Sequence, residues 1–467
     1  MKVFISMPPL DEFVVGTPQL SQNRQYQVFA QHSTIYPILL ASAATLLKSK
    51  GYDVFFDDAI TKQELYKDWI KKIKKAKPDI IAIETKTPVV NFHFQIIEVV
   101  KFVFPKTKVV LMGDHIAEFT QEALANGADY VLKTGNFDIE LLNLLENIEG
   151  KPQTKIKSLD EIPFVDRELT EWELYSRNNG NFKYLPGTYI QSARDCWWGR
   201  CTFCSWAHFY PPCNYKLRSP ENVVDEIEYL VNTYGVREIF DDAGTIPVGP
   251  WLTNLCNLLI ERGLNKKVRI SCNARFGILK PKDYKLMRKA GFRFLLFGLE
   301  SGNQETLDRI DKGIKVKDIS QGAKWASEAG LNVHLTCMIG YPWEEKRHAD
   351  KTIALVKKIF NQGHADTLQG TFVIPYPNTK LYKECLKNNQ LEVSPGDWEK
   401  FNMRHKIMKS PLSEEEIKNY VSQLYRLAFS PKFILRQILK IRCWADIKYL
   451  IRGARIIITK HLKDFRS

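Results

Sequence analysis

Three cysteines stand close together in the sequence RDCWWGRCTFCSW, residues 194–206. They are Cys196, Cys201 and Cys204, separated by four and then two other residues. Two thiolates with two residues between them can reach one metal site, and a third nearby thiolate can close on the same site. Three thiolates without an obvious fourth would leave one iron of a 4Fe–4S cluster without a protein ligand. A substrate or cofactor could then coordinate that iron directly.

Two other interpretations use the same thiols. A structural zinc site needs four ligands, and Cys213 or His208 could supply the fourth, which would make the chain a zinc-stabilised binding module. A thioredoxin-like redox pair would use only the last two cysteines of the motif and would leave Cys196 without a role. We rank both below the iron–sulfur cluster.

The composition bounds the class of protein. The chain has 467 residues, of which 44% are hydrophobic and 12% aromatic, so we expect two to three folded domains. We find no signal peptide and no apolar stretch of the roughly 18 residues that a spanning helix needs. We therefore expect a cytoplasmic protein, in which cysteines stay reduced and clustered thiols indicate metal binding or catalysis.

The net charge of +14 is concentrated near the end of the sequence. Residues 430–467 contain ten Lys and Arg against two Asp, which accounts for eight of the fourteen charges. Residues 431–462 combine these bases with apolar residues at helical spacing. We favour a helical cap packed on the preceding domain, with peripheral contact to an anionic membrane as the alternative. No nucleic-acid-binding module is recognisable, so we expect no nucleic-acid partner.

Residues 1–150 alternate short strand-like and helix-like segments. The strand segments, at 2–6, 52–56, 79–83, 108–112 and 129–132, lack in/out alternation, which is typical of a parallel sheet covered on both faces. We predict a doubly wound α/β domain, whose ligand would bind at the carboxyl ends of the strands. Residues 151–185 are polar, show no sustained period and are predicted to be a linker.

Residues 186–390 repeat the strand–helix order with a longer period. Six predicted strands lie at 188–193, 237–242, 268–273, 292–298, 332–339 and 370–375. Six such units predict a full or partial β/α barrel of the TIM type, with its chemistry at the carboxyl ends of the strands. The cysteine motif follows the first of these strands. Residues 391–467 complete the chain as a helical, basic region.

The cysteine loop and the later strand ends resemble those of radical S-adenosylmethionine (SAM) enzymes. The family usually has three residues between the first two cysteines, whereas this sequence has four. The segments FGLESGNQETL (297–307), IFDDAG (239–244), NARF (273–276) and MIGYPWE (338–344) match its other strand ends. The resemblance implies that Cys196, Cys201 and Cys204 hold a 4Fe–4S cluster whose open iron binds SAM, which is cleaved to a 5′-deoxyadenosyl radical. The SAM-binding residues that it implies are Phe203, Asp241, Asp242, Arg275, Gly298, Glu300 and Gly340.

The first domain resembles the cobalamin-binding domain that precedes many of these enzymes. The matching stretches are 33–59, 78–88, 108–124 and 127–135. Many cobalamin domains supply a lower axial histidine from an Asp-x-His-x-x-Gly loop, and no histidine of this chain has an aspartate two residues before it. Cobalamin would therefore bind without that ligand. The expected contacts are Thr85, Thr87, Gly113 and His115.

Together these resemblances imply a cobalamin-dependent radical enzyme that methylates an unactivated carbon. Cyclisation, rearrangement or oxidation without methyl transfer is the alternative reaction. The substrate would be a small molecule or lipid-like, and the electron donor a flavodoxin or ferredoxin.

Overall fold

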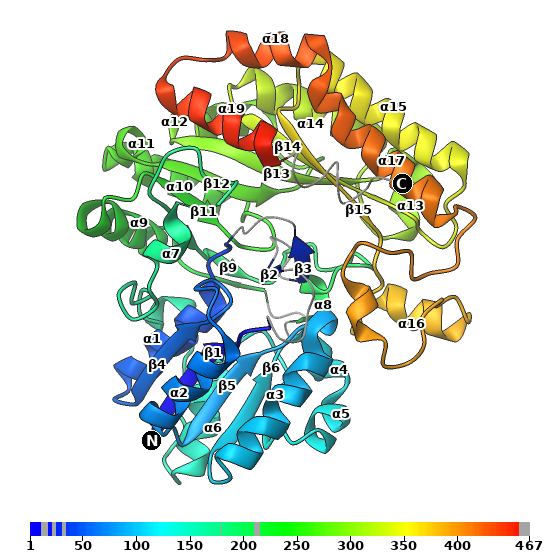
Figure 1. Cartoon of the computed structure of the whole chain (residues 1–467). Coiled ribbons are helices and arrows are strands. Elements are labelled where there is room, and N and C mark those ends of the chain that lie inside the picture. Colours follow the sequence, from blue (N-terminus) through cyan, green and yellow to red (C-terminus); the bar gives the residue numbers. More distant parts are fainter. Residues whose placement is uncertain (11–16, 21–24, 30–33, 178, 210–214, 457–467) are drawn as a thin grey trace.

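The computed structural model describes residues 1–467 except 11–16, 21–24, 30–33, 178, 210–214 and 457–467. Figure 1 shows an N-terminal α/β domain below, a larger α/β domain above it, and the last helices across the top. The carboxyl ends of the strands in the lower sheet point toward the upper domain. This arrangement places the carboxyl edge of the lower sheet, where ligands of such sheets bind, next to the upper domain.

The N-terminal domain contains a parallel sheet of five strands in the order β4-β1-β5-β6-β7. The strands are β1 (Lys2–Met7), β4 (Asp53–Asp58), β5 (Ile80–Glu84), β6 (Lys108–Met112) and β7 (Tyr130–Leu132). Strand β1 pairs with β4 on one side and with β5 on the other. The chain runs from β1 to β4 and from β5 to β6, so the connections after β1 and β5 leave in opposite directions between these two strands. In open α/β sheets, ligands bind at such a switch point.

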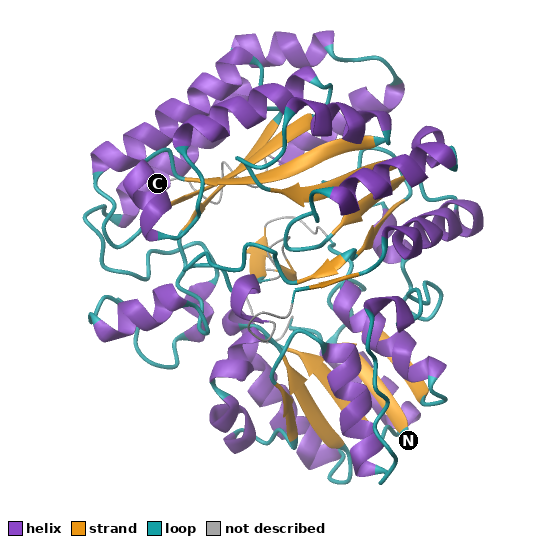
Figure 2. Ribbon diagram, turned by 180° about the vertical axis from the view of Figure 1, so that it is seen from behind, coloured by secondary structure: helices purple, strands orange, loops and turns teal. Residues whose placement is uncertain are grey.

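Helices lie on both faces of this sheet, as Figure 2 shows. They are α1 (Ile38–Ser49), α2 (Tyr66–Ala76), α3 (Val90–Val103), α4 (Asp114–Glu118), α5 (Thr120–Ala125) and α6 (Phe137–Ile148). Every residue of β5 is buried, as is all of β1 except its first residue. The absence of in/out alternation in the sequence therefore predicted the two-sided burial correctly.

The second sheet has six parallel strands in the order β15-β14-β13-β12-β11-β8. They are β8 (Gly187–Ile190), β11 (Glu238–Asp241), β12 (Arg269–Ala274), β13 (Phe292–Glu300), β14 (Asn332–Ile339) and β15 (Thr367–Phe372). Within the described residues, β8 and β15 are the two edges of this sheet. The barrel is therefore partial, one of the two forms that the sequence predicts.

Helices connect these strands and cover the outside of the partial barrel. They are α9 (Pro220–Tyr234), α10 (Pro250–Glu261), α11 (Leu264–Lys267), α12 (Pro281–Lys289), α13 (Gln304–Arg309), α14 (Val316–Glu328), α15 (Lys346–Gln362) and α16 (Lys380–Lys387). Local sequence sets their ends. In α9, the Ser219 side chain accepts a hydrogen bond from the Asn222 N–H, Pro220 occupies the first turn, and Gly235 ends the helix with φ +63°.

The C-terminal region is helical, as predicted. It contains the 3₁₀ helices η3 (Trp398–Phe401) and η4 (Leu427–Phe429), and the α-helices α17 (Glu414–Arg426), α18 (Pro431–Leu439) and α19 (Trp444–Ile456). Helix α17 packs against β14 and β15, and Gly370 of β15 lets Leu424 approach closely. Among the described residues, we find no helix with the length and hydropathy that crossing a bilayer requires.

The predicted linker 151–185 contains η2 (Leu159–Glu161), α7 (Glu173–Ser176) and a fully buried arginine. Arg167 donates to the Tyr189 carbonyl at 2.8 Å, pairs with Glu226 at 3.3 Å and lies over the Tyr36 ring. This segment therefore binds residues of both domains. The limits that we give to the domains remain predictions.

Two small antiparallel pairs were not predicted. Strands β2 (Thr17–Leu20) and β3 (Tyr26–Phe29) form a hairpin, and β3 contacts the 3₁₀ helix η1 (Thr87–Val89) after β5. Strand β9 (Ala193–Arg194) pairs with β10 (Lys216–Leu217) on either side of the cysteine loop, which includes α8 (Trp206–Phe209). Both pairs lie between the two large sheets (Figure 1).

A buried histidine in α3 predicts a pH-dependent stability. Both ring nitrogens of His93 are buried without a hydrogen-bond partner among the described residues, and burial lowers its pKa to about 3. Because the unfolded chain takes up this proton near pH 6.5, stability is lost as the pH falls below that value. The loss from this group reaches about 2 kcal/mol at pH 5.

We therefore expect His93→Leu to reduce the drop in the thermal unfolding midpoint between pH 8 and pH 5. His405 is exposed on the surface, and His405→Leu is the matched control. An unchanged pH dependence in the His93 variant would show that this ring does not cause the acid sensitivity.

Candidate functional site

The cysteine loop begins at the carboxyl end of the first barrel strand, where the sequence predicts it. Cys201 is buried, and Cys196 and Cys204 are half-buried. Asp195, with φ +71°, reverses the chain before the motif, and its carboxylate accepts a hydrogen bond from the Cys196 N–H at 2.6 Å. The Cys204 N–H donates to the Cys201 carbonyl at 3.3 Å, which closes a tight turn around the last two thiols.

The residues between the cysteines fasten the loop to the barrel. The Trp198 indole N–H donates to the Asp311 carbonyl at 2.8 Å, and Arg200 pairs with the Asp311 carboxylate at 3.0 Å. Gly313 makes room for the Trp198 ring, since a Cβ there would lie 2.1 Å from it. The Trp197 indole donates to the Ile246 carbonyl at 3.2 Å. Both tryptophans therefore anchor the loop on the barrel.

Two cations lie beside the buried thiol. Burial raises the pKa of the Cys201 thiol, and the charges of Lys312 and Arg275 act in the opposite direction. The Arg275 guanidinium lies over the Trp198 ring at 4.1 Å, and its Nε and Nη2 are buried without a partner among the described residues. These cations favour the thiolate form that binding of an iron–sulfur cluster requires. The unpartnered guanidinium nitrogens also offer donors to an anionic group.

The zinc interpretation finds no support in the described part of the chain. No three His, Cys, Asp or Glu residues there come close enough to hold a single metal ion. A cubane cluster separates its thiolates more widely than one ion does, so this observation is compatible with a 4Fe–4S cluster. Of the proposed fourth zinc ligands, Cys213 lies outside the described residues, as does the side chain of His208.

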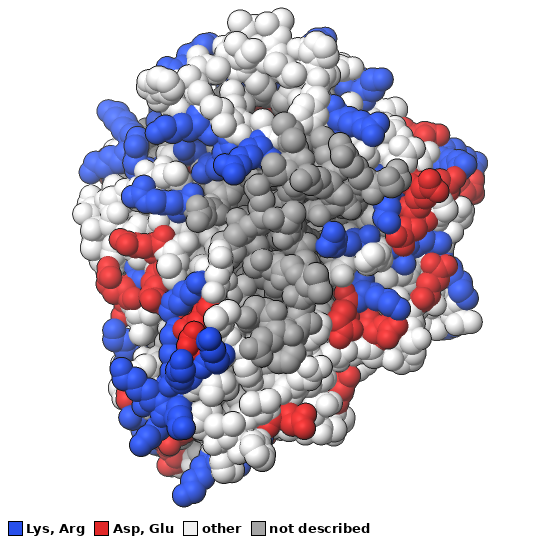
Figure 3. All heavy atoms as spheres, in the orientation of Figure 1, with Lys and Arg blue, Asp and Glu red and all other residues white. Residues whose placement is uncertain are grey.

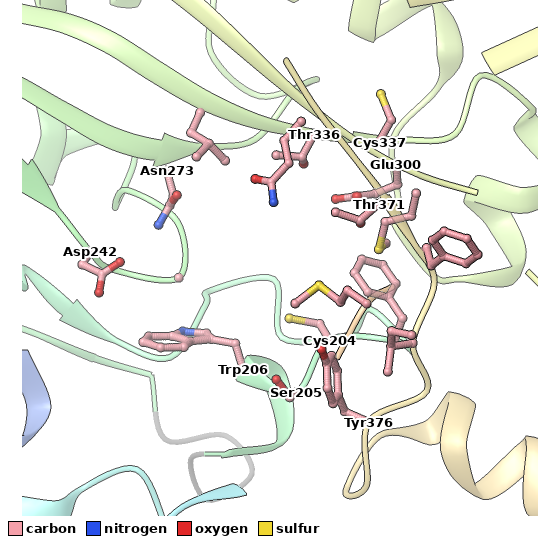
Figure 4. Close-up of a pocket in the computed structure, with 18 residues that line it drawn as sticks. Cys204, Ser205, Trp206, Asp242, Asn273, Glu300, Thr336, Cys337, Thr371 and Tyr376 are labelled. Atoms are coloured by element: carbon pink, nitrogen blue, oxygen red, sulfur yellow. The ribbon is translucent and has the colours of Figure 1, made fainter. Parts of the chain in front are cut away.

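A cavity of about 240 Å³ opens beside the loop at the carboxyl ends of the barrel strands. Figure 4 shows Cys204 and Tyr376 on one side of it, with Asn273, Thr336 and Glu300 on the other. Three predicted SAM-binding residues line it, namely Phe203, Asp242 and Glu300. The predicted cluster ligand Cys204 and these three residues therefore line the same cavity.

Glu300 is held in a specific geometry at the end of β13. Its φ is +61°, and its carboxylate pairs with Lys312 at 2.7 Å. A Cβ on Gly298 would lie 2.2 Å from Glu300 Oε1 and 2.5 Å from Lys312 Nζ, so Gly298 makes room for this ion pair. A carboxylate aimed into a cavity by a buried lysine can accept hydrogen bonds from hydroxyl or ammonium groups.

The other four predicted residues, Asp241, Arg275, Gly298 and Gly340, do not line the cavity. Arg275 stacks on the cysteine loop as described above. Asp241 accepts hydrogen bonds from the Ser192 N–H and hydroxyl, at 2.9 and 2.5 Å, and burial raises its pKa to about 6. Gly340, with φ +105°, donates its N–H to Glu344 at 2.6 Å and lies against Ile417 of α17. These contacts give Asp241 and Gly340 structural roles, and their contact with SAM remains a prediction.

Several cavity residues were not singled out from the sequence. They are Asn273, Leu296, Thr336, Cys337, Gln369, Thr371 and Tyr376. Most stand at the carboxyl end of a predicted strand, so the barrel rule could have found them. Lys312 was also missed, because it lies in a helix connection and its pairing with Glu300 depends on the tertiary fold.

The four predicted cobalamin contacts follow the neighbouring strands β5 and β6 and lie together at the carboxyl edge of the first sheet. All of them are buried, and Thr85 Oγ1 has no partner among the described residues. Thr87 Oγ1 lies 3.2 Å from His115 Nδ1. The His115 ring packs against Phe119 and Trp398, with centroids 5.0 and 4.7 Å away. His115 is thus enclosed by the η3 segment, and its contact with a corrin remains a prediction.

Gly113 has the strongest steric requirement at this edge. Its φ is +143°, and a Cβ would lie 2.0 Å from the Thr85 carbonyl oxygen. We expect Gly113→Ala to lower the free energy of unfolding by about 2–4 kcal/mol, because backbone strain and a steric clash add. Denaturant titration measures this loss in the free energy of unfolding. Gly150 also has a positive φ but nothing within 4 Å, so Gly150→Ala should cost only about 1 kcal/mol, and equal losses would refute the clash.

The cysteine loop lies directly on the N-terminal domain. Arg194, two residues before Cys196, forms a buried ion pair with Asp138 at the start of α6. The Gly135 N–H donates to the Phe209 carbonyl of α8 at 2.9 Å, and Lys86 lies 4.7 Å from the centre of the Phe209 ring. Burial raises the pKa of Tyr376, which lines the cavity, and the nearby charge of Asp114 in the first domain raises it further. The carboxyl edges of both sheets therefore face each other across this loop.

The second domain is a partial β/α barrel with three cysteines after its first strand, which is the arrangement that the resemblance to radical SAM enzymes implies. Residues 190–356 match the family model described as "Radical SAM superfamily". This part of the chain is therefore a radical SAM domain, as the resemblance of the cysteine loop and the later strand ends implied. Enzymes of this family use a 4Fe–4S cluster and SAM.

Two relatives extend the similarity beyond this domain. An uncharacterized methyltransferase from Pyrococcus horikoshii is 26% identical over 97% of this chain and 98% of its own length. Anaerobic magnesium-protoporphyrin IX monomethyl ester cyclase from Cereibacter sphaeroides is 28% identical over 85% of this chain and 67% of its own length.

Among solved structures, the radical SAM methyltransferase TsrM from Kitasatospora setae, with cobalamin and a [4Fe-4S] cluster bound, has a TM-score of 0.64 and 15% sequence identity. The match covers 91% of this chain and 88% of TsrM. It shows that both α/β domains of this chain have the same fold as those of TsrM.

Proposed function

We propose that this chain is a cobalamin-dependent radical SAM methyltransferase that transfers a methyl group to an unactivated carbon. The observation that carries the proposal is the direct contact between the cysteine loop and the carboxyl edge of the first sheet. The buried Arg194–Asp138 pair and the Gly135–Phe209 hydrogen bond hold these two parts together. A radical formed at one edge could then act on a substrate that also reaches the other.

The residues in and beside the cysteine loop would have different roles in this reaction. Cys196, Cys201 and Cys204 would hold the cluster, and Lys312 and Arg275 would balance its negative charge in a site with little water. Cluster and SAM together supply one-electron chemistry that generates an organic radical, and bound methylcobalamin supplies a methyl group. Phe203, Trp197 and Trp198 would keep water away from the radical.

The N-terminal edge offers partners for a corrin. Thr85 Oγ1 and the Tyr26 hydroxyl are buried without partners among the described residues, so both could bond to amide side chains of cobalamin. Gly113 keeps the backbone of the β6 loop within contact of Thr85. Since the sequence lacks the Asp-x-His motif, this edge would hold the corrin without that axial histidine.

A cyclisation is the second candidate reaction, because the name of the Cereibacter sphaeroides relative describes a cyclase. The cavity and the loop would serve both reactions equally. The fate of the methyl group distinguishes them, and in either case a low-potential flavodoxin or ferredoxin would supply the electron.

The test uses anaerobically reconstituted protein with SAM labelled in its methyl group, a reductant, cobalamin and an extract of small molecules and lipids. Cleavage of SAM to 5′-deoxyadenosine leaves the label in methionine, so the labelled product sought is one other than methionine. We expect formation of 5′-deoxyadenosine together with such a labelled product, and no such product without cobalamin. Formation of 5′-deoxyadenosine with an unlabelled product would support cyclisation or another rearrangement. Labelled product without cobalamin would refute the role of the first domain.

A further inference from the structure

The C-terminal helices have one side on the barrel and one side open. On the inner side of α18, the Phe433 ring lies 5.6 Å from that of Phe360, and Arg436 donates to the carbonyls of Phe360 and Ala365, both at 2.7 Å. On α19, Arg452 donates to the Phe182 carbonyl. These contacts are those of the helical cap that the sequence favours, and they fix the orientation of both helices.

The outer side of the same helices is apolar. In α18, Ile434, Leu435, Ile438 and Leu439 are between 44% and 64% exposed, and no residue of the helix is buried. Trp444 and Ile451 of α19 are 75% and 64% exposed. We call these six residues the outer apolar face. Ile434, Leu435, Ile438 and Leu439 lie on one side of α18 by their helical spacing, and exposed apolar residues grouped in this way usually mark an interaction surface.

The net charge of α18, α19 and their flanking residues is positive, and one of the bases, Lys440, pairs with the buried Asp366 at 2.5 Å. Residues 426–456 contain eight Lys and Arg against a single acid, Asp446, which is buried and paired with Lys183. The exposed bases are Arg426, Lys432, Lys440, Arg442, Lys448 and Arg455. In Figure 3, the top of the molecule, where α18 lies, is mostly white, with Lys and Arg at its margins.

We propose that the outer apolar face of α18 and α19 docks on the surface of an anionic lipid bilayer. The apolar side chains would enter the boundary between headgroups and acyl chains, while the surrounding Lys and Arg would meet lipid phosphates. A second copy of the chain fits less well, because a two-fold contact would place the same bases against each other. Nucleic acid would match the bases but leave Leu435, Leu439 and Trp444 without apolar partners.

The test is flotation of the full-length protein with vesicles of phosphatidylcholine, with or without phosphatidylglycerol. We expect binding to vesicles that contain phosphatidylglycerol, little binding to phosphatidylcholine alone, and release at high salt. Leu435→Asp with Leu439→Asp should reduce the bound fraction about tenfold, because both side chains are exposed and carry much of the apolar contact.

Phe102→Asp is the matched control, since Phe102 is 88% exposed on α3 of the other domain. It should bind vesicles like the wild type, and both variants should retain SAM cleavage. Equal binding of the wild type and the Leu435/Leu439 variant, or no binding to anionic vesicles, would overturn the proposal. So would sedimentation showing a wild-type dimer that this variant dissociates, because the face would then bind a second copy.

Discussion

Replacing Cys204 with alanine is expected to remove the iron–sulfur absorbance of the reconstituted protein and to reduce SAM cleavage by on the order of a thousandfold or more. Cys204 lines the cavity with Glu300 and closes the turn that brings the last two thiols together. Two thiolates alone would leave the cluster without enough protein ligands. Iron and sulfide analysis, with quantification of 5′-deoxyadenosine, measures both effects.

The same outcome is expected for Cys196→Ala and Cys201→Ala, since each thiol holds one iron in this assignment. Cys443 is exposed in the C-terminal region, far along the sequence from the motif, and Cys443→Ala should keep both cluster and activity. If any motif variant keeps a full cluster and normal cleavage, that cysteine is not a ligand.

Asp138→Ala is expected to lower the free energy of unfolding by about 3–5 kcal/mol and to uncouple the two domains. Burial alone would raise the pKa of Asp138, but the Arg194 charge and hydrogen bonds from Ser42 and Ile139 hold it below its usual range. The Asp138 carboxylate is therefore charged at neutral pH, and its removal leaves the Arg194 guanidinium buried without its ion-pair partner. Denaturant unfolding at pH 7.5 measures the loss.

A double replacement separates the charge effect from lost packing. Asp138→Leu with Arg194→Met removes both charges and should recover most of the stability, because apolar residues often replace a buried pair at little cost. Lys48–Asp166 is a more exposed pair, and Asp166→Ala should have a smaller effect. Similar losses in Asp138→Ala and in the double variant would contradict the assignment to an unpaired buried charge.

Most of both sheets could be predicted because their strands are short apolar runs with regular helical segments between them. The predicted strand 108–112 matches β6, and the predicted strand 79–83 is shifted by one residue from β5. The β2–β3 hairpin was missed because its pairing depends on contacts with the edge of the first sheet. Strand β8 ends at Ile190, earlier than predicted, because hydrogen bonds from Ser192 to Asp241 turn the chain there.

Some residues of the candidate site could likewise be predicted from the sequence, and others could not. Cys204, Glu300 and Asp242 could be found because local motifs at strand ends specify them. The Glu300–Lys312 pair and the contact of Trp398 with His115 could not, because no local pattern indicates which distant side chains meet. No local pattern indicates that the Asp241 carboxylate accepts a hydrogen bond from the Ser192 N–H.

The measurement that tests the central claim most directly is electron paramagnetic resonance of the anaerobically reconstituted, dithionite-reduced protein, recorded before and after addition of SAM. The account predicts about four iron and four sulfide per chain and a reduced-cluster signal whose shape changes when SAM binds the open iron. A protein that instead carries zinc, or a reduced cluster whose signal SAM leaves unchanged, would contradict it.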